Sequence, residues 1–459
     1  MEQLSSHSFA ERFIRGNILG RFWSSAHTLI GLVTSFITLT ALSVHQFGLY
    51  QLVLAAVVLA DTLSVNFFDE VVQNDISRAL SDNRQGTAKR LFHELAFLKV
   101  GLGILSALAL FLAANLVSGM YDKDIGFYIR IVSFLVGIRA IRSTAQIFLA
   151  SVVSLRALGT PAVEEISKLV LVSGFFFFSE LSISRVLIAT IVGATAALIY
   201  VSISFFREYR AFFRGNAAVR GFLLKDIVKS YGSWVLLRSA IKKIAKPIQP
   251  WLIVTLLNAE AVALYSLAAN LVTMVKDLFP AASSSLLAWE VNNASRLKYI
   301  FGRGMKYSFF YGLTLMALAF FFVPLIVEML FPKYLPAMPL FYIFLISVPF
   351  HGIQTLEMAI LTALREQKVL AMRLFAEILM GFGIFIAFVP FMGLLAAGIG
   401  AVVPTLWRAW FLYGRIVKKY PELRPDTQTF FRFDEEDRLI IRRALTEAKS
   451  FLKKYSTSP

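Results

Sequence analysis

Long apolar stretches recur along almost the whole of the 459-residue chain. A transmembrane helix needs about 20 predominantly apolar residues, and twelve stretches come close to or exceed that length. They cover approximately residues 17–42, 47–67, 91–118, 125–154, 161–179, 185–206, 228–257, 260–285, 307–330, 338–364, 369–390 and 393–417. The pattern predicts an all-α polytopic membrane protein with about 12 transmembrane helices.

Composition excludes several other classes of protein. Apolar residues make up 57% of the chain and charged residues only 16%, whereas a soluble domain has about 45–50% and about 25%. Too few charges remain to cover a soluble surface. Cysteine is absent, which removes disulfides, thiolate metal sites and cysteine nucleophiles. The five histidines show no metal-ligand spacing, so we predict no cofactor.

The distribution of positive charge predicts the topology. The chain carries a net charge of +17, and cytoplasmic loops of membrane proteins are rich in Lys and Arg. With a cytoplasmic N-terminus, the inner segments before residue 418 carry nineteen Lys and Arg residues. The outer loops carry only Lys123, Arg185 and Lys333. We therefore expect both termini in the cytoplasm, and we assign the charge surplus to the membrane rather than to nucleic acid.

Two sequence echoes indicate an internal repeat. Leu49-Tyr50 recurs 215 residues later as Leu264-Tyr265, and Ala150-x4-Leu155-Arg156 recurs 209 residues later at Ala359. Both echoes place equivalent helices six spans apart, so the halves share the same orientation in the membrane. This predicts a six-helix lobe over 1–206, a second over 207–417 and a cytoplasmic tail over 418–459.

The tail contains a candidate amphipathic basic helix. An acidic run at 434–437 suits a helix N-terminus. Apolar residues follow at helical spacing, with basic residues beside them, at Ile441, Leu445, Ala448, Leu452 and Tyr455. Such a helix can lie on the anionic inner leaflet or pack on the protein's own loops, and the sequence leaves both open.

Charged residues within the spans are the strongest functional signal, because an ionisable group at bilayer depth costs about 3 kcal/mol or more and usually faces a cavity or a partner. In the seventh span Arg238, Lys242 and Lys246 follow one helical stripe, interrupted by two prolines. Six cations are candidate ligands of an anionic substrate: Arg21, Arg139, Arg142, Arg238, Lys242 and Lys246. Guanidinium and ammonium groups both suit phosphate oxygens.

Acidic residues within the spans have two possible roles. Asp61, Asp277 and Glu377 are candidates to bind a coupling cation or proton. They are equally suited to act as counter-ions for nearby Arg or Lys. Cations outnumber acids within the spans, which favours the counter-ion role.

Enzyme motifs are missing. The chain has no G-x-x-x-x-G-K-[ST] phosphate loop, no nucleophile elbow and no H-E-x-x-H. The outer loops are only a few residues long. We predict that the protein is not an enzyme.

Several segments of the second half resemble a known group of transporters. They are the turn 258–268, Leu330-Phe331-Pro332-Lys333-Tyr334, Phe388-Val389-Pro390 and the Gly- and Ala-rich run 393–401. Together with the twelve spans, they resemble the multidrug/oligosaccharidyl-lipid/polysaccharide (MOP) exporter superfamily, and within it the polysaccharide branch of Wzx-type flippases.

The resemblance implies two lobes around a central cavity that opens alternately to each side. It also implies that the protein flips a polyprenyl-diphosphate-linked oligosaccharide across a prokaryotic cytoplasmic (inner) membrane. The expected partners are the lipid-linked glycan, membrane lipids and glycan assembly proteins. No residue of the six candidate cations is carried over from a family motif, so these residues rest on depth and spacing.

Three alternatives remain open at this point. A multidrug cation antiporter of the same superfamily would extrude cations, which a positive cavity repels. A related lipid II flippase usually has fourteen spans, against twelve here. A non-transporting scaffold would gain little from cations buried within its spans.

Overall fold

The computed structural model describes residues 6–63, 69–121, 123–152, 154–213, 219, 221–225, 233–279, 294–364, 366–424, 430–431, 433–435, 437–439 and 446. Within these ranges the chain is almost entirely helical and has no β strand. It forms two compact units. Unit 1 comprises Met1–Asn270, Pro324–Leu340 and Phe382–Ala397, and unit 2 comprises Leu271–Val323, Phe341–Gly381 and Gly398–Pro459.

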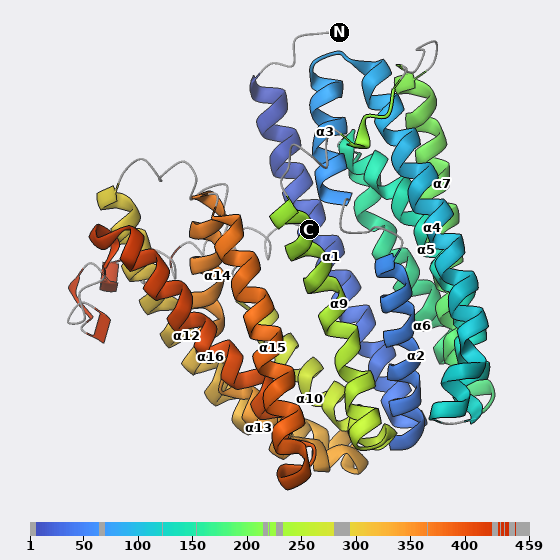
Figure 1. Cartoon of the computed structure of the whole chain (residues 1–459), viewed down its shortest axis with the longest axis vertical. Coiled ribbons are helices and arrows are strands. Elements are labelled where there is room, and N and C mark those ends of the chain that lie inside the picture. Colours follow the sequence, from blue (N-terminus) through green and yellow to red (C-terminus); the bar gives the residue numbers. More distant parts are fainter. Residues whose placement is uncertain are drawn as a thin grey trace. The chain divides into compact units, whose positions relative to one another are not determined.

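Long helices dominate both units (Figure 1). The first half of the chain forms α1 (Ser6–Ala41), α2 (Val44–Leu63), α3 (Asp69–Ser81), α4 (Gln85–Met120), α5 (Lys123–Ser151), α6 (Thr160–Phe178) and α7 (Ile183–Phe213). The second half forms α9 (Ser233–Leu256), α10 (Ala259–Asp277), α12 (Ala294–Leu330), α13 (Met338–Leu345), α14 (Val348–Ala363), α15 (Gln367–Met392) and α16 (Leu395–Lys419). Short 3-10 turns lie at Leu155–Gly159, Pro332–Ala337 and Pro421–Leu423.

Each of the twelve predicted spans coincides with one of these helices or, for 338–364, with the pair α13 and α14. The protein is therefore a multi-pass membrane protein of the predicted all-α class. Among the described residues, seven helices are apolar enough to cross a membrane alone. A pair bent by 46°, Pro332–Leu345 with Val348–Ala363, gives an eighth. Helices α5, α6, α9 and α10 fall outside this set, and each of them carries several charged residues.

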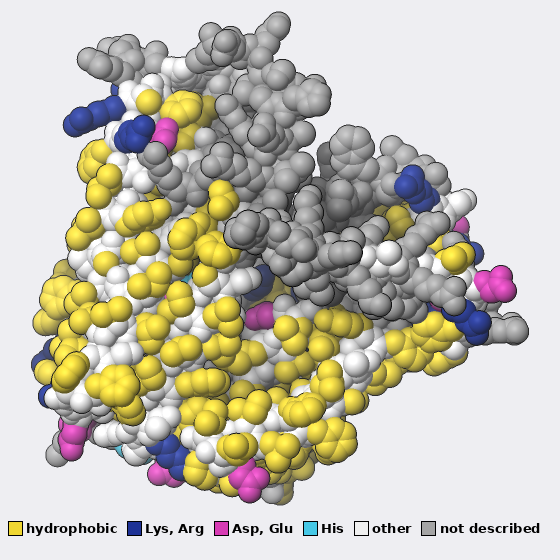
Figure 2. Space-filling view, turned by 180° about the vertical axis from the view of Figure 1, so that it is seen from behind, with side chains coloured by type: hydrophobic (Ala, Val, Ile, Leu, Met, Phe, Trp, Pro, Cys, Tyr) yellow, Lys and Arg dark blue, Asp and Glu magenta, His cyan; other side chains and the backbone are white. Residues whose placement is uncertain are grey.

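The surface matches a membrane environment. Figure 2 shows apolar side chains along the flanks of the described helices, with charged side chains mainly near the helix ends. Large apolar residues such as Phe97, Leu116 and Phe178 are exposed on these helices. Lipid replaces water around such residues, so their exposure has no hydrophobic cost.

Helix α3 was not predicted from the sequence. It is short and amphipathic, and its apolar residues Val71, Val72, Ile76 and Ala79 are buried in the core of unit 1. That core also contains Phe92, Phe148 and Phe213 from α4, α5 and α7. Sliding hydropathy overlooks such a helix because eight of its thirteen residues are polar.

Two pairs of helix boundaries show the same offset as the first sequence echo. Helix α1 ends at Ala41 and α9 at Leu256, while α2 begins at Val44 and α10 at Ala259, so both pairs are 215 residues apart. The residues before α2 and α10 act as caps at the same offset. The Ser43 hydroxyl accepts a hydrogen bond from Gln46 N at 3.2 Å, and Asn258 Oδ1 accepts one from Ala261 N at 2.8 Å. The lobe boundary near residue 207 stays a prediction.

Candidate functional site

Two arginines and two carboxylates form a charged cluster inside unit 1, called here the unit 1 cluster. Arg139 and Arg142 lie three residues apart on α5. The Arg139 guanidinium donates to Asp61 on α2 at 3.2 Å and lies 3.9 Å from Glu164 on α6. Arg142 donates to the other oxygen of Glu164. The cluster thus connects α2, α5 and α6 through ion pairs whose side chains are 13–26% exposed.

The unit 1 cluster retains unused hydrogen-bond donors. The Nε atoms of Arg139 and Arg142 are buried and have no partner among the described residues. A buried N–H group without a partner costs roughly 1–3 kcal/mol, and such groups in native proteins usually bind water or a ligand. These donors can therefore form hydrogen bonds to an anionic group in addition to those that the two carboxylates accept.

Further charged pairs surround the cluster. Lys99 on α4 is fully buried and donates to both oxygens of Asp69 at 2.6 Å. Lys168 lies 4.0 Å from Glu165 on α6. Sequence analysis did not single out Lys99 or Lys168. The sequence did contain a signal for Lys99, because this lysine lies in the middle of a 36-residue helix.

Helix α9 belongs to unit 1 and carries the predicted cationic stripe. It stays helical through Pro247 and Pro250. Arg238 is half-buried, whereas Lys242 and Lys246 are exposed. The structure places these three residues on one helix. Arg21 lies in α1, and its side chain is outside the described residues.

Unit 2 contains its own charged cluster, the unit 2 cluster, on α14, α15 and α16. Glu377 accepts hydrogen bonds from Arg373 at 2.9 Å and from Arg408 at 3.1 Å. Arg408 also donates to Gln354, whose amide donates to the Thr405 carbonyl at 2.7 Å. Glu377 was predicted, but Arg408 and Gln354 were missed. A cation within the twelfth span was the signal for Arg408.

Glu357 lies one helical turn from Gln354 on α14 and is completely buried. Neither of its carboxyl oxygens has a hydrogen-bond partner among the described residues. Asp277, the third predicted acid, is instead exposed at the end of α10. Within the described part of the chain, no group of three His, Asp or Glu residues could hold a metal ion.

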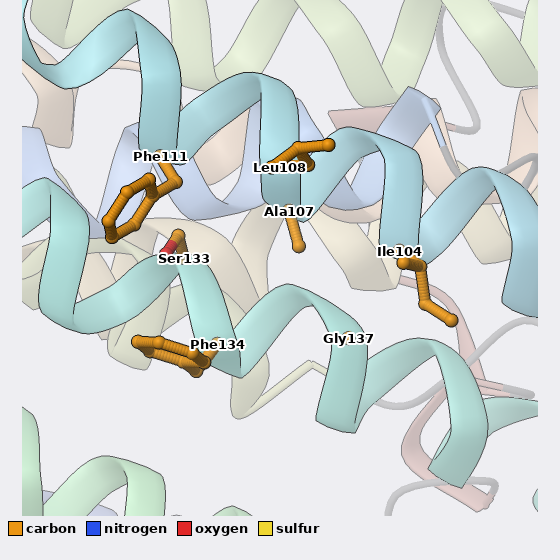
Figure 3. A pocket seen from close by; sticks show the side chains of 7 residues that line it. All are labelled: Ile104, Ala107, Leu108, Phe111, Ser133, Phe134 and Gly137. Atoms are coloured by element: carbon orange, nitrogen blue, oxygen red, sulfur yellow. The ribbon is translucent and has the colours of Figure 1, made fainter.

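A shallow apolar hollow lies between α4 and α5 on unit 1 (Figure 3). Its volume is about 420 Å³, and Ile104, Leu108, Phe111 and Phe134 are among its lining residues. Three of these side chains are more than half exposed. An apolar, open hollow on an apolar face suits a hydrocarbon chain of a lipid.

Comparison with known proteins identifies the family. Residues 22–287, more than half of the chain, match the polysaccharide biosynthesis protein family. The chain belongs to this family. No curated protein matches it.

Solved structures show the same fold in the MOP superfamily. A multidrug resistance MATE family transporter in an inward-facing conformation is 18% identical, with a TM-score of 0.70 over 86% of this chain and 95% of that chain. The lipid II flippase MurJ in an inward closed conformation is 13% identical, with a TM-score of 0.69 over 88% and 90%. A MOP transporter from Pyrococcus furiosus, whose binding pocket is described as having reverse polarity, is 17% identical, with a TM-score of 0.62 over 90% and 96%.

Proposed function

We propose that this protein flips a polyprenyl-diphosphate-linked oligosaccharide across the cytoplasmic membrane for polysaccharide export. The arginine pair of the unit 1 cluster is the observation that carries the proposal. Arg139 and Arg142 keep buried Nε donors without partners, and planar guanidinium groups bind phosphate oxygens in a bidentate manner. Membership of the polysaccharide biosynthesis protein family agrees with a glycan substrate.

The lysines of α9 extend this positive region in the proposal. Lys242 and Lys246 are exposed on a helix of the same compact unit. Asp61 and Glu164 neutralise the arginines while no substrate is bound. A diphosphate would then compete with these carboxylates for the same guanidinium groups, so binding is strong enough to capture the headgroup and weak enough to release it.

We further propose a topology and a transport motion. Both termini lie in the cytoplasm, and two six-helix lobes divided near residue 207 open a central cavity alternately to the two sides. Glycan assembly proteins supply the substrate on the inner side and remove it on the outer side. Asp61 and Glu377 serve as counter-ions of arginines, as their ion pairs with Arg139 and Arg408 support.

A deletion strain with intact downstream glycan ligation tests the function. The polyprenyl-linked glycans of this strain are extracted and quantified against the parent strain and a complemented strain. Accumulation of a complete repeat unit on the lipid, reversed by complementation, is the expected result. An unchanged lipid pool in the deletion strain contradicts the proposal.

Variants then test the residues. Arg142→Ala and Lys242→Ala are expected to lower flipping by at least about tenfold, the effect of losing roughly 1.4 kcal/mol of binding. The readout is export in the complemented strain, normalised to the amount of protein in the membrane. Lys298→Ala removes an exposed cation near the start of α12 and serves as the matched control. If both test variants export like this control, the unit 1 cations are not the substrate site.

The antiporter alternative is tested in the same strains. A multidrug cation antiporter predicts that deletion sensitises cells to cationic drugs while the lipid-linked glycans stay unchanged. A lipid II flippase predicts loss of cell-wall integrity instead. The buried arginines of unit 1 favour an anionic substrate over a cationic drug, because like charges repel at close range.

A further inference from the structure

A short segment beyond the last helix is fixed to unit 2 by buried charges. The Asp437 carboxylate accepts hydrogen bonds from Lys306, from Arg303 and, at 2.5 Å, from the Tyr307 hydroxyl. These three donors lie near the start of α12. Both Lys306 and Asp437 are buried, with side chains at most 1% exposed. Such partners offset the cost of burying a carboxylate at this depth.

Asp434 makes a second set of contacts. Its two oxygens accept hydrogen bonds from Arg303 at 2.8 and 3.1 Å, which is a bidentate pairing. Asp434 Oδ1 also accepts a bond from Asp437 N, and Asp437 Oδ2 accepts one from Asp434 N. These reciprocal bonds form a capping box at the start of a helical turn. The acidic run therefore begins a helix, and it also binds α12.

Aromatic residues strengthen the same attachment. Phe430 packs on Phe309 with ring centroids 5.9 Å apart, and Phe433 packs on Phe310 at 5.1 Å. The Lys306 ammonium lies 4.3 Å from the centroid of the Phe433 ring. Phe430 also packs against the apolar core of unit 2 that contains Phe301 and Leu412. The segment 430–439 thus contributes to the core of unit 2.

Unit 1 has a segment in the corresponding place. Residues 221–225 lie along the start of α4, where Glu94 Oε2 accepts hydrogen bonds from Leu223 N at 2.9 Å and Leu224 N at 3.0 Å. Arg90 donates to the Gly221 carbonyl at 2.9 Å, and Val219 N donates to the Gly86 carbonyl at 3.3 Å. Leu224 begins a helical turn, as Glu435 does in unit 2.

The two attachments occupy equivalent positions. Glu94 is the tenth residue of α4, and Arg303 is the tenth residue of α12. The offset of 209 residues equals that of the sequence echo at Ala150 and Ala359. Phe92 and Phe301 share this offset, and both are buried against a tyrosine, at centroid distances of 6.0 Å for Tyr209 and 6.4 Å for Tyr413.

We propose that the described residues between 430 and 439 form a strap that closes unit 2, as residue 219 and residues 221–225 close unit 1. In each unit the chain leaving the last long helix returns across the start of the third long helix of the repeat, and charged residues fix it there. The strap of unit 2 is a part of the folded transporter. It holds α12 and α16 together at one end of the unit, which in the proposed topology is the cytoplasmic end. This inference rests on the fold alone and not on the proposed substrate.

Purified full-length protein in detergent tests the strap. Asp437→Asn and Lys306→Gln are each expected to lower Tm by roughly 5 °C, because each removes one charge of the buried Lys306–Asp437 ion pair. The double variant is expected to lose about as much as the worse single variant, since the two residues act as a pair. The exposed neighbour Glu435→Gln is the matched control. The strap proposal would be overturned if the losses of Tm add in the double variant, or if the single variants lose no more Tm than the control.

A second measurement applies even when a charge variant does not fold. The chain contains no cysteine, so Phe310→Cys with Phe433→Cys introduces a single defined pair. A short bismaleimide is expected to link the two thiols within one chain, and the two single-cysteine variants are the controls. If the two thiols are not cross-linked in a protein with wild-type Tm, the strap does not pack against α12. Neither readout depends on transport, so a failed strap and a failed flippase remain distinct results.

Discussion

The two compact units both bury charge, but they balance it differently. In unit 1, Arg139 and Arg142 each reach a carboxylate on another helix. In unit 2, Glu377 is shared between two arginines, while Glu357 lies buried without a hydrogen-bond partner among the described residues. The helix pairs α1–α2 and α9–α10 thus have the same spacing and capping pattern, yet each compact unit has its own arrangement of charges.

The largest expected effect comes from breaking the unit 1 cluster. Glu164→Leu removes the partner of Arg142 and leaves a mostly buried guanidinium without its carboxylate. Breaking a buried ion pair in this way costs about 3–5 kcal/mol. We expect a large fall in Tm of the purified protein, measured by thermal unfolding in detergent. Glu180→Gln, at an exposed acid on the same chain, is the control. Equal Tm values for the two variants would show that the cluster is not an energetic unit.

A smaller loss is expected at the strap of unit 1. Glu94→Ala removes the acceptor of two backbone N–H groups, and each unsatisfied group costs about 1–3 kcal/mol unless water replaces the bond. Hydrogen exchange at Leu223 and Leu224 measures the release directly. Faster exchange at these amides with little change elsewhere is the expected pattern. Exchange at wild-type rates would mean that Glu94 does not hold the segment.

Glu357 sharpens the contrast within unit 2. Because its oxygens have no hydrogen-bond partner among the described residues, Glu357→Gln removes none of the described hydrogen bonds, and we expect stability to stay within about 1 kcal/mol of wild type or to rise. Glu377→Gln is the paired comparison, and it should destabilise because it weakens contacts to two arginines. Equal losses of stability in the two variants would contradict this difference between Glu357 and Glu377.

The smallest effect concerns acid pH at the strap of unit 2. Burial raises the pKa of the Asp437 carboxyl, but hydrogen bonds from Lys306 and Tyr307 lower it by more, so its pKa lies well below the ordinary value. The hydrogen bond from Arg303 likewise lowers the pKa of Asp434. A depressed pKa gives stability that is complete above the unfolded value of about 3.9 and is lost as pH falls toward the folded value.

We therefore expect the Tm difference between wild type and Asp437→Asn to stay constant from neutral pH down to about pH 5 and to shrink below about pH 4. Thermal unfolding over a pH series measures it. A difference that already shrinks between pH 7 and pH 5 would mean that Asp437 is not held by these cations.

Much of the fold was predictable, because apolar length and helix caps are local properties. The twelve predicted apolar stretches coincide with described helices, and the 215-residue offset was predicted from Leu49-Tyr50 and Leu264-Tyr265. Helix α3 was missed because its hydropathy is low and only its packing defines it. The helix after the acidic run is described only as far as Leu439 and at Thr446, so its amphipathic part at Ile441, Leu445, Ala448, Leu452 and Tyr455 stays a prediction outside the described residues.

The pairing of the charged residues was less predictable. Sequence analysis selected Arg139, Arg142 and Asp61 by depth, and the structure shows which partner each one has. Arg139 lies 78 residues from Asp61 along the chain, and no local pattern encodes such a distance. Sequence analysis did not select Arg408 and Gln354, because no local pattern encodes their contact either. Strap contacts join residues 130–134 positions apart, so the acidic run looked like a helix start and nothing more.

The position of the strap also has a consequence for biosynthesis. The ribosome completes Glu94 and the segment that Glu94 binds before it reaches α9, so this first attachment can form early in synthesis. Lys306 is synthesised 131 residues ahead of Asp437, and α13, α14, α15 and α16 are translated in between. Arg303 and Lys306 therefore cannot pair with Asp434 and Asp437 until translation is nearly complete. A nascent chain halted after α16 would carry every membrane helix and still lack the residues that close its second half.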